Sequence, residues 1–151
     1  MTTSIAMAVA ATAAALVPLS PAHAAYGADQ PVYLQLVTND GYATQLALLD
    51  GTVAFDDGNT KYRYSLRLCW QHAYPQPYFT INVNGTSTAS PTQTGPTSMS
   101  GCQQAYAYSG EVNFGSTVRN VRFDVTGGWF GSNGQYQMRT KSTYTYDNPY
   151  N

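Results

Sequence analysis

The chain has 151 residues, with seven basic and eight acidic side chains and a formal net charge of −1. That length suits one domain with a sizeable core, and so few charges give no basic face to attract a phosphate backbone. No apolar run is long enough to span a bilayer. We therefore expect neither a nucleic-acid nor a membrane partner.

The first element of the chain is an alanine-rich apolar run over residues 5–19, followed by small residues that include Ala22 and Ala24. An apolar stretch followed by small residues at alternate positions is the pattern that signal peptidase cuts. The sequence thus predicts a signal peptide over residues 1–24, although no Lys or Arg precedes the apolar run. We expect a secreted, extracellular protein.

Cleavage after Ala24 creates an extended N-terminal tail over residues 25–31, which contains Tyr26. A short segment of small residues at a chain end is usually frayed. Its alternative role is to add to a partner's sheet or to lie in a partner's cleft.

After the tail, apolar and polar residues alternate over short segments separated by turn residues, which is typical of β-strands. The clearest alternation covers residues 61–70, with Tyr62, Tyr64, Leu66, Leu68 and Trp70 on the face expected to pack the core. Other strands are expected at 32–37, 42–49, 78–83, 104–108, 118–125 and 135–146, with turns at 39–41, 50–51, 57–59 and 84–85. Residues 86–101 read as a long Ser/Thr/Pro/Gly-rich loop.

About eight strands without a helical period predict an all-β fold, a single antiparallel β-sandwich domain over residues 32–151. A small β-barrel is the alternative. Cys69 and Cys102 are expected to form one disulfide in an oxidising compartment, worth about 3–4 kcal/mol through the unfolded chain. Because Cys69 lies on the polar face of its strand, the bridge should sit outside the main core.

Catalytic groups are scarce after residue 24, where His72 is the single histidine and Glu111 the single glutamate. The sequence contains no metal-ligand or phosphate-loop motif, so we expect no cofactor and no enzymatic activity. The remote alternative is a small secreted ribonuclease, in which Glu111 acts as base, His72 as acid, and Arg119 or Arg122 binds the phosphate.

Two aromatic segments are candidate recognition loops. Residues 70–78 combine prolines with His72 and Tyr74, and residues 127–134 place Trp129 and Phe130 together between glycines. The competing interpretation is that these rings fold back and cap the end of the sandwich. Among the other tyrosines, Tyr136 is expected in the core and Tyr144 and Tyr146 near the surface.

Small size, one disulfide, rigid aromatic loops and few catalytic groups favour a binding module for another secreted protein, as an adaptor or as an enzyme inhibitor. A carbohydrate-binding module is the alternative, because exposed rings beside Asn, Gln and Asp can stack on sugars. In its size, signal peptide and single β domain with a free N-terminus at Ala25-Tyr26-Gly27, the chain resembles the small adaptor subunit of bacterial umbrella toxin particles. The resemblance implies an adaptor role without catalysis, with the N-terminal segment inserted into a partner's cleft.

Overall fold

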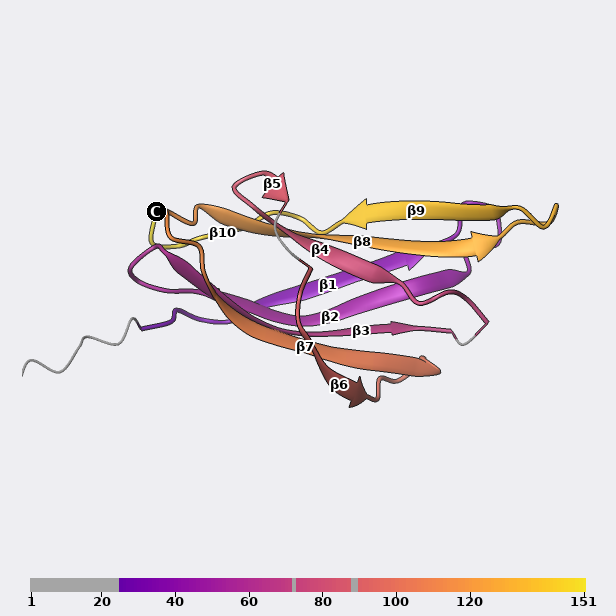
Figure 1. Cartoon of the computed structure of the whole chain (residues 1–151), viewed down its shortest axis with the longest axis horizontal. Helices are drawn as coiled ribbons and strands as arrows, with labels where there is room; N and C mark the ends of the chain where they lie inside the picture. The colour runs from indigo at the N-terminus through magenta and orange to yellow at the C-terminus, as the bar shows by residue number, and fades with distance from the viewer. Residues whose placement is uncertain (1–24, 72, 88–89) are drawn as a thin grey trace, which may run out of the picture.

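The computed structural model describes residues 25–71, 73–87 and 90–151, so the predicted signal peptide and His72 lie outside the described residues. The described chain contains no helix; its strands form two antiparallel sheets packed face to face (Figure 1). The strands are β1 (Gln30–Val37), β2 (Gln45–Phe55), β3 (Lys61–Trp70), β4 (Tyr78–Val83), β5 (Thr86–Ser87), β6 (Gln93–Thr97), β7 (Gln104–Asn113), β8 (Asn120–Phe130), β9 (Tyr136–Ser142) and β10 (Tyr146–Asp147).

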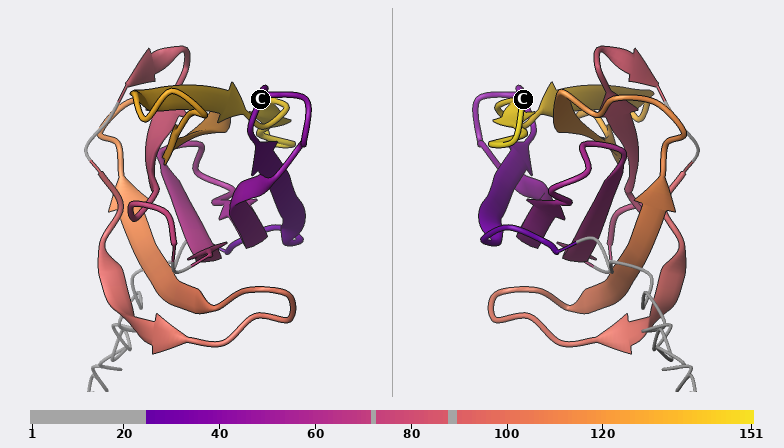
Figure 2. Two further views of the ribbon diagram at one scale, coloured as in Figure 1. Left: turned by 90° about the vertical axis from the view of Figure 1, so that its right-hand side faces the viewer. Right: turned by 90° about the vertical axis from the view of Figure 1, so that its left-hand side faces the viewer.

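The first sheet has the order β1-β2-β3-β7-β6, and the second has the order β10-β8-β4-β5, with β9 also paired to β8. Figure 2 shows the two layers from both ends of the molecule. The predicted β-sandwich is confirmed, and the described strands do not close into a barrel. No described helix is long and apolar enough to cross a membrane.

The core lies between the sheets and follows the alternation of the sequence. In β3 the five side chains predicted to face inward are all buried, Trp70 included. Aromatic rings join the layers: Phe79 of β4 meets Tyr108 of β7 edge-on, with ring centroids 5.0 Å apart. Tyr146 is buried beside Phe123, so the expectation that it is exposed was wrong.

The dipeptide Asp50-Gly51 lies inside β2 and is not a turn. Gly51 pairs with Val32 on one side and with Leu66 on the other. Its φ is +147°, and a Cβ there would lie 2.1 Å from the Ser65 carbonyl oxygen. Glycine is therefore needed for close approach of β2 and β3, which is a recognised use of glycine within a strand.

The stretch 86–101 is not a continuous loop, because it contributes β5 to the second sheet and β6 to the first. β6 pairs with β7 as the edge of its sheet, with a register shift between Gln93 and Gly95. Proline and glycine are tolerated at edges and bulges because their backbone need not complete a ladder on both sides. That tolerance explains why the composition of this stretch was misleading.

Side chains from β9 and the segment after it cover the open edge of β1. Arg139 and Lys141 donate to the carbonyl oxygens of Val37 and Gln35, at 2.9 and 3.1 Å. The Tyr144 hydroxyl donates to the Pro31 carbonyl at 3.0 Å. An uncovered strand edge can template pairing with other chains, and cationic side chains are one common protection against it.

The disulfide between Cys69 and Cys102 is present. It lies outside the core cluster, as predicted. Cys69 is nevertheless fully buried, because residues 99–103 cross the end of β3. That crossing is held by the Gln71 side-chain amide, which donates to the Gly101 carbonyl at 3.0 Å, and by the Gln103 amide, which donates to the Trp70 carbonyl at 3.3 Å.

Candidate functional site

The outer face of the second sheet carries a group of exposed apolar side chains. Tyr78 of β4, Phe130 of β8, and Tyr136 and Met138 of β9 are 52%, 62%, 49% and 54% exposed. We call these four residues the aromatic strip. They share one face because side chains alternate along a strand, and because Phe130 pairs with Tyr136 while Met138 pairs with Gly128. The expectation that Tyr136 lies in the core was wrong.

Gly128 shapes the centre of the aromatic strip. A Cβ at this position would lie 2.1 Å from the Tyr136 hydroxyl oxygen, so the tyrosine lies directly across the glycine. Phe130 then contacts the same ring, with centroids 5.5 Å apart and planes tilted by 55°. Phe130 is the last residue of β8 and Tyr136 the first of β9, so strand pairing and the hairpin turn between them together set the positions of both rings.

The same face becomes polar toward the other end of β8. The hydroxyl groups of Thr126 and Thr140 are 2.7 Å apart. Beyond them the Asp124 carboxylate accepts hydrogen bonds from Arg122 at 2.9 and 3.1 Å and from the Asn82 amide at 2.6 Å.

The charges of this polar end balance each other. Burial acts to raise the pKa of Asp124, but hydrogen bonds from Arg122, Ser142 and Asn82 outweigh it and lower the pKa below its ordinary value. Asp124 therefore stays ionised beside Arg122.

From Arg122 to Phe130 the face runs about 27 Å, at roughly 3.4 Å per residue, from a neutral polar end to an apolar end.

The outer face of the first sheet differs in character, because exposed ion pairs cross it. Arg63 pairs with Asp29 at 3.1 Å, and Lys61 pairs with Glu111 at 3.5 Å. Arg67 pairs with Asp50 on the same face. Charged side chains that are already paired with each other contribute little to binding another protein, so we place the candidate binding site on the second sheet.

The structure separates the predicted pair Trp129 and Phe130. Residues 127–130 belong to β8, so their side chains alternate: Trp129 is 3% exposed and packs in the core, whereas Phe130 points to solvent. Sequence reasoning included Tyr78 only as the last residue of the candidate loop 70–78, and it missed Met138. Continuing the alternation of residues 118–125 through Gly127 and Gly128 is the signal that could have found this face.

Tyr74 lies partly buried against the core, not at an exposed tip. His72 belongs to the same segment but lies outside the described residues. Tyr26 lies on the first sheet, where the Arg63 guanidinium is 4.7 Å from its ring centroid. Burial, and then the carboxylates of Glu111 and Asp56, raise the pKa of Tyr26 to about 12. Tyr26 therefore lies on the sheet opposite the one that carries the aromatic strip.

The three described residues of the ribonuclease alternative, Glu111, Arg119 and Arg122, do not converge. Glu111 faces outward from the first sheet beside Lys61, whereas Arg122 faces outward from the second sheet and is bound to Asp124. Arg119 lies at the end of the sandwich near Asn148. Among the described residues, no three His, Cys, Asp or Glu side chains are grouped to hold a metal ion.

A cleft of about 390 Å³ at the start of β8 is lined by Arg119, Asn120, Asp147, Asn148 and Asn151. Its polar groups already hold the C-terminal segment. The Asn148 and Asn151 amides both donate to the Val118 carbonyl, at 2.7 and 3.0 Å. We therefore interpret this cleft as structural.

The aromatic strip is exposed and stands on paired strands, an arrangement suited to binding a surface. Its polar end adds hydrogen-bonding groups without net charge. Comparison with models of known protein families, with curated proteins and with solved structures finds no match to this chain.

Proposed function

We propose that this protein is a secreted, non-enzymatic module that binds another extracellular protein through the aromatic strip, as an adaptor within an assembly. The observation that carries the proposal is the exposure of Tyr78, Phe130, Tyr136 and Met138 on one face of the second sheet. Aromatic residues, Met and Arg are enriched where proteins meet, and a polar rim normally surrounds such a centre.

The test is capture of a partner from the culture supernatant of the producing organism, with the protein tagged at its C-terminus. The informative variant is Phe130→Ala combined with Tyr136→Ala. Truncating two central aromatic side chains should weaken a protein complex at least about 30-fold, the effect of losing roughly 2 kcal/mol. Because both side chains are exposed, unfolding by urea should change little.

The matched control is Tyr33→Ala, which removes a 60% exposed ring from β1, where it pairs with Asp50 on the outer face of the first sheet. A stoichiometric partner that the control retains and the double variant loses supports the proposal. A partner that both variants retain equally would mean that binding uses another surface.

Carbohydrate binding is the second candidate, favoured by the position of the Thr126–Thr140 hydroxyl pair and the Asp124 cluster beside exposed rings. Tyrosine and phenylalanine rings can stack on the apolar face of a sugar while such groups bind its hydroxyls. Retention on insoluble polysaccharide that is lost in the double variant, without a captured protein, would replace the first proposal by this one. RNA cleavage abolished by His72→Ala would contradict both.

A further inference from the structure

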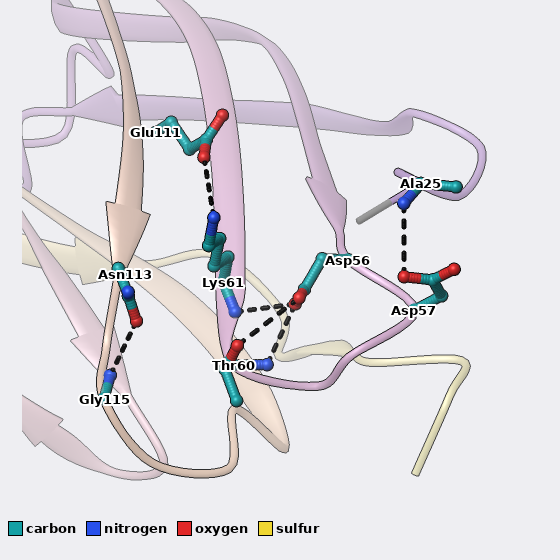
Figure 3. Close-up of polar contacts among 8 residues, drawn as sticks. All are labelled: Ala25, Asp56, Asp57, Thr60, Lys61, Glu111, Asn113 and Gly115. Carbon is teal, nitrogen blue, oxygen red and sulfur yellow. Dashed lines mark hydrogen bonds and ion pairs between the residues drawn. The ribbon is translucent and has the colours of Figure 1, made fainter. Parts of the chain in front are cut away.

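The first described residue is held by its own chain through both of its backbone groups. The Ala25 nitrogen lies 3.2 Å from Oδ1 of Asp57, and the Asp57 amide donates to the Ala25 carbonyl at 3.0 Å. Figure 3 shows the Asp57 carboxylate directed at that nitrogen. Gly27 continues the pairing by donating to the Phe55 carbonyl at 2.9 Å. The tail thus extends the ladder beyond the end of β2.

The turn after β2 fixes Asp57 in this position. Its neighbour Asp56 is buried, and one oxygen of the Asp56 carboxylate accepts hydrogen bonds from the backbone amides of Thr60 and Lys61, at 2.9 and 2.6 Å (Figure 3). The carboxylate of Asp57 takes no part in that network. No Lys or Arg of the described chain forms an ion pair with it.

We propose that the Asp57 carboxylate is the binding site for the α-ammonium group of the mature chain. The inference rests on the export that the proposed function includes. Signal peptidase would add water across the Ala24–Ala25 peptide bond, leaving a carboxylate on Ala24 and an amine on Ala25. An α-amine with an ordinary pKa near 7.7–8.0 takes up a proton at neutral pH. The neutral donor at Ala25 then becomes a cation 3.2 Å from a carboxylate.

Such a change strengthens an existing contact without moving the chain, because the donor gains a positive charge beside the carboxylate and the hydrogen bond becomes an ion pair. The contacts that follow along the tail would benefit from it. Asp29 pairs with Arg63 at 3.1 Å, and the Arg63 guanidinium covers the Tyr26 ring. Gly27 lies against Tyr150, since a Cβ on Gly27 would be 2.6 Å from the Tyr150 hydroxyl oxygen. Processing would therefore fasten the tail to its own domain.

The test measures coupling between the N-terminal charge and Asp57. Four proteins that begin at Ala25 are compared: the free amine and its Nα-acetyl form, each with Asp57 or with Asp57→Asn. Hydrogen exchange of the Gly27 amide reports opening of the tail. We expect acetylation and Asp57→Asn each to speed exchange about two- to five-fold, the range for an exposed ion pair, and the two together to add nothing further.

Asp29→Asn is the matched control, because it removes the other ion pair of the tail. In that variant acetylation should still speed exchange by its full factor. Multiplicative effects of acetylation and Asp57→Asn, or no effect of acetylation, would overturn the inference. Mass spectrometry of the secreted protein should find Ala25 as its first residue, and any other start overturns the inference too. Partner capture through the aromatic strip is measured separately, so the two proposals can fail independently.

Discussion

Replacing Gly51 by alanine should damage the first sheet far more than replacing a glycine of similar backbone conformation elsewhere. Gly51 has a φ of +147° and Gly95 a φ of +150°, so an alanine is strained at both positions. The surroundings differ. A Cβ at Gly51 would meet the Ser65 carbonyl oxygen at 2.1 Å and the Leu66 Cα at 2.8 Å, whereas nothing lies within 4 Å of a Cβ at Gly95.

These differences set the expected magnitudes. Backbone strain alone costs about 1–2 kcal/mol, which is the effect we expect for Gly95→Ala. At Gly51 the clash is with backbone, so β2 and β3 must also separate, and losing about two ladder hydrogen bonds brings the total to about 3–4 kcal/mol. For a domain of this size that loss corresponds to a fall in Tm of roughly 10–15 °C.

Urea unfolding followed by the fluorescence of buried Trp70 and Trp129 measures both variants under the same conditions. The free energy of unfolding should fall at least about twice as far for Gly51→Ala as for Gly95→Ala, if strain is about 1–2 kcal/mol. Equal losses would contradict this prediction, because they would mean that the close approach of β2 and β3 at Gly51 contributes nothing beyond the φ angle.

Gly128→Ala should displace the Tyr136 ring and weaken partner capture, while thermal unfolding changes less than in Gly51→Ala, because the atom in the way belongs to a side chain. Tyr26 should ionise near pH 12 in an ultraviolet titration. Since its pKa in the unfolded chain is about 10, the stability it contributes is complete below pH 10 and is lost as pH rises toward 12, which urea midpoints across that range can follow. Asp124 has a lowered pKa, so its contribution is present above about pH 4 and is lost on acidification. Asp124→Asn should therefore make unfolding less dependent on pH below pH 4, and an unchanged acid slope would contradict this.

The sequence was sufficient to predict the inward face of a strand where one face is buried and the other is exposed. The alternation of Tyr62, Leu66 and Trp70 predicted the inward face of β3, and Asn84-Gly85 predicted the turn after β4, where both residues have positive φ. Burial of one face and positive φ leave local signatures in residue type.

The sequence did not predict the structure where the role of a residue depends on a contact with a residue far away in the chain. The sequence around Gly127 predicts a loop, yet a Cβ there would lie 3.1 Å from Leu36 and 3.2 Å from Leu46, so the glycine makes room for strands of the other sheet. The docking of Ala25 on Asp57 depends likewise on residues 32 positions apart, and nothing near Ala25 signals it. The aromatic strip emerged only when the pairing of β8 with β9 was known.

The two ends of the described chain lie at the same end of the sandwich, where Gly27 meets Tyr150 and the Asn59 amide donates to the Tyr150 carbonyl at 2.6 Å (Figure 1). The hairpin of β8 and β9, with Phe130 and Tyr136, turns at the opposite end. A circular permutant could therefore join residue 151 to residue 25 through a short linker and open the chain at residues 132–133. It would preserve the strand order of both sheets while releasing the closed hairpin that sets the two rings, so recognition could be weakened without dismantling the domain.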